Sequence, residues 1–220
     1  MIITIDGPAG SGKSTAARGL AACLGIAYLD TGAMYRAVTL KAMRDGADLH
    51  DEQALALIAR TMKLEIGPQP DGMSVSLDGQ DVTNEIRSPE ITDQTHYAAS
   101  SPAVREALVE LQRSIGRRLG SFVAEGRDQG SVVFPDADVK FYLKANPAVR
   151  AERRRAELHR SGQQVTLQEI LTAIEQRDRR DEGRQVGPLV KPPGAIEIDT
   201  TDNTIAQTRR QLLSHLEAAK

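Results

Sequence analysis

The sequence lacks several features that mark particular protein classes. Cys23 is its single cysteine, so no disulfide can form within the chain, and we expect this residue to fill core space on the first helix. No apolar run approaches the length of a membrane span, and the start of the chain has neither the basic nor the apolar region of a signal peptide. We therefore expect a protein of the reducing cytoplasm with no membrane segment.

Aromatic residues and excess charge are also scarce. The chain has no tryptophan, aromatic residues are 3% of its 220 residues, and none follows Tyr142. Lysine and arginine (28) nearly balance aspartate and glutamate (30). A net charge of −2 produces no overall field toward nucleic acid or membrane, and few aromatics are present to stack on bases, so we expect no nucleic-acid partner. The four histidines show no metal-ligand spacing.

The most informative stretch is a glycine-rich loop near the start. It fits the pattern G-x-x-x-x-G-K-[ST] and consists of Gly7, Pro8, Ala9, Gly10, Ser11, Gly12, Lys13 and Ser14. An apolar run, 2–5, precedes it, and apolar residues at helical spacing follow it. This context predicts a phosphate-binding loop between a buried strand and a helix, in which Lys13 reaches the β- and γ-phosphates and the Ser14 hydroxyl ligates Mg²⁺.

Apolar runs of strand length alternate with amphipathic helical patterns along the chain. The predicted strands cover residues 2–5, 26–29, 122–124, 139–143 and 195–198, and helical patterns cover 55–62, 102–119 and 204–218. This alternation predicts an α/β fold with a five-stranded parallel sheet and helices on both faces. The helix from Pro102 carries one basic residue in its first two turns, Arg105, which by its type is expected at a solvated rim.

A different pattern interrupts this alternation between residues 64 and 82. Short β-type runs at 64–66, 73–77 and 80–82 are separated by Asp71-Gly72 and Asp78-Gly79, and Asp-Gly between such runs favours a hairpin. We predict an inserted antiparallel β subdomain that holds a substrate; simple decoration of the fold is the alternative.

Two polar loops follow predicted strands, at the sheet edge where α/β folds bind ligands. Asp30 and Thr31 form the first, with Arg36 one helical turn beyond Gly32. The second contains Arg127 and Asp128 between two glycines. A substrate role and a helix cap are both open for Asp30 and Thr31, and a substrate role and an ion-paired turn for the second loop.

An arginine-rich segment, 149–184, completes the list of unusual features. Between Arg150 and Arg184 lie nine arginines, no lysine and seven carboxylates. Arginine suits phosphate oxygens, whereas such helices are usually solvated faces with i,i+4 pairs. Ser161-Gly162 between two helical patterns is consistent with the tip of a helical lid, and the spacing places Arg177, Asp181 and Arg184 on one face.

With these features in order, the chain resembles the bacterial cytidylate kinases, which are nucleoside monophosphate kinases with a phosphate loop. The resemblance covers essentially the whole chain, and the motifs that carry it are Gly7–Ser14, 29–36, 81–87, 104–108, 126–128, 132–137 and 177–181. It implies one kinase domain over residues 1–220, with a core of about 1–35, 87–148 and 186–220, an acceptor-binding insertion of about 36–86 and a lid of about 149–185. It also implies transfer of the γ-phosphate of ATP, bound with Mg²⁺, to CMP or dCMP in pyrimidine metabolism by a cytoplasmic monomer.

The same resemblance implies roles for individual residues. Lys13, Arg127 and Arg184 would be catalytic. The glycine-rich loop, Thr15 and the lid residues Arg153 and Arg154, with Arg155 beside them, would bind ATP. The acceptor would meet Arg36, Arg127 and Arg184 at its phosphate, Arg177 and Asp181 at its sugar, and Thr31, His96, Arg105 and Asp128 at its base.

Two positions depart from the family's pattern. His96 stands where a base-contacting serine is typical, and Gln129 stands where an apolar residue is usual. Another small phosphate-loop kinase (for adenylate, shikimate or dephospho-coenzyme A), a nucleotide-dependent switch and an RNA-binding module are the competing interpretations. The inserted β pattern weighs against another small kinase, and the absence of an Asn-Lys-x-Asp motif weighs against a GTP-dependent switch. The scarcity of aromatic residues weighs against an RNA-binding module.

Overall fold

The computed structural model describes residues 1–69, 72–160 and 162–218. The chain divides into two units, each compact in itself: unit 1 comprises Met1–Gly25 and Glu125–Lys220, and unit 2 comprises Ile26–Ala124. A five-stranded sheet has the order β2-β6-β1-β7-β8, and a three-stranded sheet has the order β3-β4-β5. The parallel sheet with flanking helices and the small antiparallel sheet confirm the predicted fold class.

Unit 1 carries the glycine-rich loop and the arginine-rich helices. Its elements are β1 (Ile2–Asp6), α1 (Lys13–Leu24), the end of β6 (Phe122–Gly126), the π-helical turn η2 (Gln129–Val133), β7 (Val139–Lys144), α6 (Pro147–Arg160), α7 (Leu167–Glu182), β8 (Ile196–Asp199) and α8 (Ile205–Ala218). β7 pairs in parallel with β1, Ile5 opposite Phe141, and with β8, Phe141 opposite Ile196. Ile5, Leu20, Phe141 and Leu212 are buried in its core.

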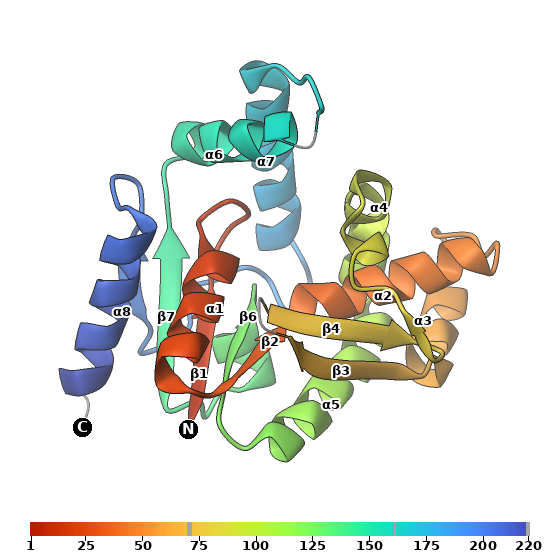
Figure 1. Ribbon diagram of the computed structural model, residues 1–220. Helices are drawn as coiled ribbons and strands as arrows, with labels where there is room; N and C mark the ends of the chain where they lie inside the picture. The colour runs from red at the N-terminus through yellow and green to blue at the C-terminus, as the bar shows by residue number, and fades with distance from the viewer. Residues whose placement is uncertain (70–71, 161, 219–220) are drawn as a thin grey trace. The chain divides into compact units, whose positions relative to one another are not determined.

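The expected lid is a pair of helices in unit 1. α6 and α7 lie beyond the carboxyl end of β7 (Figure 1) and pack on each other around Ala151, Ile170 and Ile174. A capping box of Thr166 and Glu169 starts α7: the Glu169 N–H donates to the Thr166 hydroxyl, and the Glu169 carboxylate accepts the Thr166 N–H. Of the predicted tip, Ser161 lies outside the described residues.

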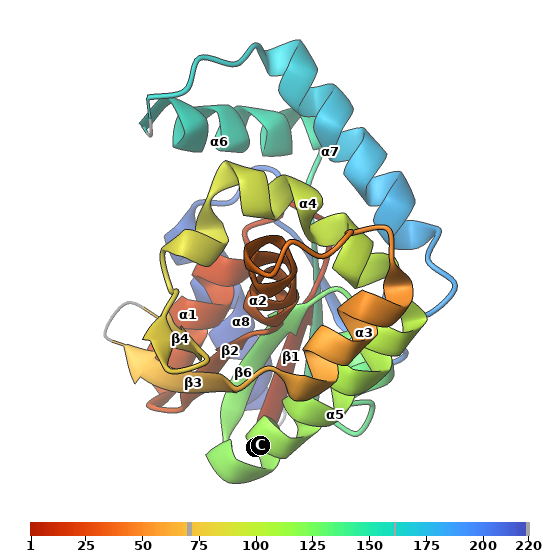
Figure 2. The same cartoon turned by 90° about the vertical axis from the view of Figure 1, so that its right-hand side faces the viewer.

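Unit 2 contains the antiparallel sheet and a helical layer. Its elements are β2 (Ala27–Asp30), α2 (Thr31–Arg44), α3 (Glu52–Thr61), β3 (Leu64–Gln69), β4 (Gly72–Leu77), β5 (Gln80–Asp81), η1 (Glu85–Arg87), α4 (Pro89–Ser100), α5 (Pro102–Leu119) and the start of β6. β3 and β4 pair with Leu64 opposite Leu77, and Figure 2 shows α3 beside α5. The predicted β insertion is therefore present; of its first turn signal, Asp71 lies outside the described residues.

Side-chain caps define most helix starts in unit 2. The Asp30 carboxylate accepts the Ala33 N–H and begins α2, and Asp51 begins α3 in the same way. Ser88 and Ser101 cap α4 and α5, each followed by proline at the first helical position. Asp30 is thus the helix cap that was one of the two interpretations of its loop.

One expectation about the core is wrong. Cys23 is exposed, not packed in the core: the buried face of α1 is formed by Ala16, Ala17, Leu20 and Ala21.

Candidate active site

The glycine-rich loop joins β1 to α1 in a conformation that requires glycine at its start. Gly7 has φ +148°, and a Cβ there would lie 2.0 Å from the carbonyl oxygen of Leu143 on β7. Gly12, at φ +87°, directly precedes the first helical residue, Lys13. The loop therefore leads straight into a helix N-terminus, where backbone N–H groups and the helix dipole favour an anion.

Lys13 is buried within this loop. Its Nζ donates a 2.7 Å hydrogen bond to the carbonyl oxygen of Pro8, and the residue is 5% exposed. Burial, followed by the positive charge of Arg127, lowers the pKa of Lys13, and Glu125 opposes this shift. The ammonium is thus folded back onto its own loop in a desolvated environment, where an anionic ligand would stabilise its charged form.

Sequence reasoning missed Glu125 as a partner of the loop. Its Oε2 accepts a 2.9 Å hydrogen bond from the Ser14 hydroxyl, and the glutamate is buried at the carboxyl end of β6. A hydroxyl beside a carboxylate is an oxygen donor pair of the kind that Mg²⁺ prefers. Within the described residues no cluster of three or more His, Cys, Asp or Glu could hold a metal by itself, so a Mg²⁺ ion bound here would take its remaining ligands from phosphate oxygens and water.

Asp6, at the end of β1, was also missed. The residue is fully buried; Oδ1 accepts the Gln129 N–H at 2.8 Å and Oδ2 accepts the Gly130 N–H at 2.7 Å. Burial raises the pKa of Asp6 to about 7, against the lowering effect of these two hydrogen bonds. One buried carboxylate therefore ties the strand before the phosphate loop to the helical turn that follows Asp128.

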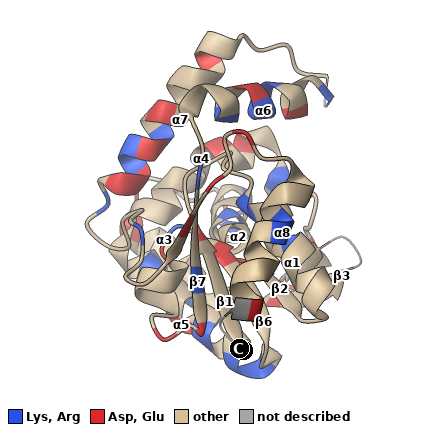
Figure 3. Ribbon diagram, turned by 90° about the vertical axis from the view of Figure 1, so that its left-hand side faces the viewer, with Lys and Arg blue, Asp and Glu red and all other residues tan. Residues whose placement is uncertain are grey.

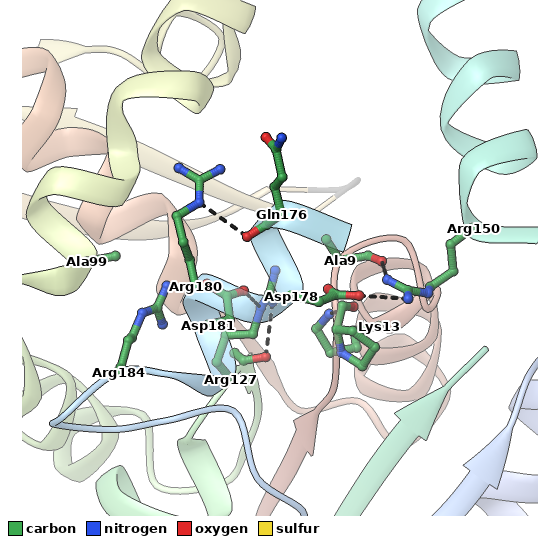
Figure 4. A network of polar contacts seen from close by, with 12 residues as sticks. Ala9, Lys13, Ala99, Arg127, Arg150, Gln176, Asp178, Arg180, Asp181 and Arg184 are labelled. Carbon is green, nitrogen blue, oxygen red and sulfur yellow. Dashed lines mark hydrogen bonds and ion pairs between the residues drawn. The ribbon is translucent and has the colours of Figure 1, made fainter. Parts of the chain in front are cut away.

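Arginines from two parts of unit 1 converge on one carboxylate. Asp181 Oδ2 accepts a 2.8 Å hydrogen bond from Arg127 Nε, and its Oδ1 pairs with Arg184 (Figure 4). Burial alone would raise the pKa of Asp181. The positive charges of Arg127, Arg184 and Arg177 together outweigh this effect, so the pKa lies below its ordinary value. The cluster carries more positive than negative charge and suits phosphate oxygens. The spacing predicted Arg177, Asp181 and Arg184 on one face; Arg184 pairs with Asp181 from just beyond the end of α7, and Arg127 was not part of that prediction.

Three arginines of α6 have different surroundings. Arg150 is buried; it donates to the carbonyl oxygens of Ala9 and Ala145 at 3.0 Å each and pairs with Asp178 of α7 at 2.7 Å (Figure 4). Arg153 donates to Thr200, beyond β8, and Arg154 pairs with Glu157 on its own helix. Figure 3 shows basic and acidic segments interleaved along α7. Arg150, which had no assigned role, is thus an α6 residue hydrogen-bonded to the phosphate loop, whereas Arg153 and Arg154 have partners elsewhere.

In unit 2, Asp30 brings two arginines together. Its Oδ2 accepts from Arg36 at 2.8 Å and from Arg87 at 3.1 Å. Arg36 was predicted to point back toward this edge, but Arg87 was recognised only as the end of a motif. Thr31, the first residue of α2, is buried beside Asp30.

Arg105 lies in the interior of unit 2, not at a solvated rim as its type suggested. It is 2% exposed; its guanidinium lies over the Tyr35 ring, 5.5 Å from the centroid, and donates to the Ala99 carbonyl at 3.4 Å. These contacts fix the position of the Arg105 guanidinium. The expectation of a solvated rim failed because helical spacing does not reveal partners on other helices.

His96 and Asp128 complete the predicted base-reading set. His96 lies on α4, with Nδ1 2.7 Å from the carbonyl oxygen of Asp93 and its ring 4.1 Å from that of Tyr97. Asp128 is buried at the start of η2, in unit 1. The phosphate-loop residues, Arg127, Asp128, Asp181 and Arg184 thus belong to unit 1, and Thr31, Arg36, His96 and Arg105 to unit 2.

Known proteins resemble this chain over nearly its full length. The cytidylate kinase family model matches residues 3–218. A cytidylate kinase of Pelotomaculum thermopropionicum is 46% identical over 99% of this chain and 96% of its own length. One of Caldanaerobacter subterraneus subsp. tengcongensis is 48% identical over 92% of this chain and 88% of its own. These matches carry the family assignment.

The fold also recurs in a solved structure. The crystal structure of TT1252 from Thermus thermophilus shares 19% sequence identity with a TM-score of 0.53, covering 99% of this chain and 96% of that one. Within residues 1–69, 72–160 and 162–218, no helix is long and apolar enough to cross a membrane.

Proposed function

This chain belongs to the cytidylate kinase family, and from that membership we propose that it transfers the γ-phosphate of ATP to CMP or dCMP, giving ADP and CDP or dCDP. One observation carries the proposal beyond the family: unit 1 contains both a phosphate loop with a buried lysine and a pair of partly buried arginines around the buried Asp181. Phosphoryl transfer depends on positioning two anionic substrates and neutralising their charge, and these features supply both.

The donor would be held by the glycine-rich loop and α1. We assign Gly7–Ser14 and Thr15 to the phosphates of ATP, with Lys13 exchanging its bond to the Pro8 carbonyl for one to a phosphate oxygen. Arg153 and Arg154 remain proposed ATP-side residues. Lys13 is supported as a catalytic residue by its burial, since a desolvated ammonium interacts more strongly with charge that develops during transfer.

Mg²⁺ is the expected cofactor with ATP, and the residues present fit it. The Ser14 hydroxyl and the Glu125 carboxylate are adjacent oxygen donors, and Glu125 is buried next to the loop. The ion, when bound, would neutralise charge on the phosphate oxygens. The chain's own residues orient these oxygens: Glu125 accepts a hydrogen bond from the Ser14 hydroxyl, so the lone pairs of the Ser14 oxygen point away from Glu125.

The acceptor's phosphate and sugar are assigned to charged residues. Arg36, Arg127 and Arg184 would bind the phosphate, and Arg127 and Arg184 would also stabilise the transferring group. Arg177 and Asp181 would contact the sugar. Support comes from the excess of guanidinium over carboxylate around both Asp181 and Asp30.

Base selection is assigned to Asp128 and Arg105, with Thr31 and His96 nearby. Cytosine presents an amino donor beside the N3 and O2 acceptors. A carboxylate accepts from that amino group, and a guanidinium donates to the acceptors. Uracil presents a carbonyl in place of the amino group, so Asp128 would face it acceptor to acceptor. The burial of Asp128 and Arg105 supports these roles, because an unpaired polar group is costly where water is absent.

The remaining parts of the proposal concern organisation. We keep the insertion of about 36–86 as the acceptor-binding part and the segment of about 149–185 as a lid that excludes water from the transfer. A monomer in the cytoplasm, acting in pyrimidine metabolism, is proposed from the family and its two soluble nucleotide substrates.

A coupled assay over a panel of nucleoside monophosphates tests this function. ATP consumption should be rapid with CMP and dCMP, slower with UMP and near background with AMP or without an acceptor. Equal consumption with and without CMP would instead support a nucleotide-dependent switch, and preference for AMP would support another small kinase.

A further inference from the structure

In unit 2 the carboxylate of Asp30 pairs with two arginines, Arg36 and Arg87, and the proposed function assigns a role only to Arg36. Asp30 is almost completely buried, with its Oδ1 engaged by the Ala33 N–H at 3.0 Å. Its Oδ2 accepts from both Arg36 and Arg87. Arg87 ends η1, 57 residues along the chain from Asp30, so the pair joins two distant segments of the unit.

The charges in this cluster do not balance. Two guanidinium groups share one carboxylate. Burial alone would raise the pKa of Asp30, but Arg36 and Arg87 outweigh this effect and hold the pKa below its ordinary value. The cluster therefore has a net positive charge. Arg36 also has a buried Nε for which the described residues offer no acceptor. A surplus of charge and of N–H donors indicates an anion as the missing partner.

A neighbouring arginine shows what a purely structural pair looks like here. Arg44 donates to both oxygens of Glu85, at 3.3 and 2.6 Å, and to Gln80 at 3.1 Å. One cation meets one anion, and the charge is cancelled. Arg87 differs because it shares the single carboxylate of Asp30 with Arg36, so its charge is not fully compensated.

Exposure and space favour a ligand that approaches from the Arg87 side. The Arg36 side chain is 16% exposed and that of Arg87 is 46% exposed. A Cβ on Gly32 would lie 3.1 Å from Arg36 Nη1 and 3.2 Å from Asp30 Oδ1, so glycine leaves room for the cluster. The guanidinium of Arg36 is thus fixed in the interior, whereas that of Arg87 is partly exposed and accessible to a ligand.

We propose that Arg87 is a second ligand of the acceptor's phosphate in unit 2, beside Arg36, and that Asp30 is the positioning residue that holds both guanidiniums. This rests on the proposed function, which supplies the phosphomonoester. A phosphate dianion matches two guanidiniums better than a carboxylate does, because it has three oxygens and more charge to share. The competing explanation is a structural clamp between η1 and the β2–α2 junction.

Affinity for CMP and for cytidine separates these explanations. Calorimetric titration would compare the wild type with Arg87→Ala, Arg87→Lys and the matched control Arg44→Ala. We expect Arg87→Ala to weaken CMP about ten- to a hundredfold, as for loss of a hydrogen bond between charged groups, and to leave cytidine affinity unchanged. Arg87→Lys should fall between the wild type and Arg87→Ala, because lysine retains the charge but not the planar donor pair. Arg44→Ala should bind both ligands like the wild type.

Two results would overturn the inference. One is CMP affinity of Arg87→Ala within twofold of the control; the other is an equal loss for CMP and cytidine together with a lower Tm, as a clamp predicts. Turnover of the wild type with ATP and CMP is measured in parallel. Its absence counts against the proposed function, whereas wild-type turnover with unchanged Arg87→Ala affinity counts against Arg87 alone. Failure of the wild type to bind CMP would refute both.

Discussion

The buried carboxylate of Asp6 should give this protein a measurable pH dependence of stability. Desolvation raises the pKa of Asp6 from 3.8 to about 7, and Asp128 adds to the rise; the N–H groups of Gly130 and Gln129, and Lys13, oppose it. The folded protein therefore holds a proton on Asp6 at pH values where the unfolded chain has released it. Asp6→Asn removes this titration and keeps the size of the side chain.

The sign and size follow from proton linkage. The folded pKa lies above the unfolded value, so the contribution is fully present below about pH 4 and is lost as the pH rises to about 7. In that window the free energy of unfolding falls by about 1.4 kcal/mol per pH unit, and by about 4 kcal/mol in all. Above pH 7 this group adds no further change.

The variant has a constant penalty instead. The asparagine carbonyl can accept one of the two N–H groups, and the other loses its acceptor, which costs about 1–3 kcal/mol at every pH. The wild type's stability relative to the variant should therefore fall by about 4 kcal/mol between pH 4 and pH 8. Urea unfolding at five pH values measures it, with Asp202→Asn as the control for loss of an exposed carboxylate. A difference that is constant or rises with pH would refute the reasoning.

Three further predictions concern the proposed reaction. Lys13→Ala should lower kcat about a hundred- to a thousandfold, since charge on the β- and γ-phosphates is no longer neutralised; steady-state activity within tenfold of the wild type would exclude this role. Asp128→Asn should reduce the CMP/UMP ratio of kcat/KM about tenfold or more, mainly through loss of CMP activity, and an unchanged ratio would move base reading toward His96. Amide exchange across 149–184 should slow when ATP and CMP are both bound; identical exchange with and without them would indicate a static, solvated pair of helices.

Features encoded within a few neighbouring residues could be predicted from the sequence. The phosphate loop depends on glycines at fixed spacing next to a strand, and the β insertion on short apolar runs between turn residues. Both are local patterns, and the structure contains both elements. The helix α4 was missed because its buried residues, Ile91, Ala98 and Ala99, form too weak an apolar stripe.

Contacts between distant segments could not be predicted in the same way. Asp6 meets Gln129 from 123 residues away, and Ser14 meets Glu125 from 111 residues away. No periodicity reports such pairings, because they depend on how strands are ordered in the sheet. Arg105 was misjudged for the same reason, since its partners lie on α2 and α4.

Phosphorus NMR of one reaction mixture tests the central claim most directly. The protein would be incubated with ATP, Mg²⁺ and CMP, and the products followed with time. Transfer predicts CDP and ADP appearing in equal amounts, with no inorganic phosphate and no ATP consumption when CMP is left out. Formation of ADP and inorganic phosphate at a rate independent of CMP would contradict it.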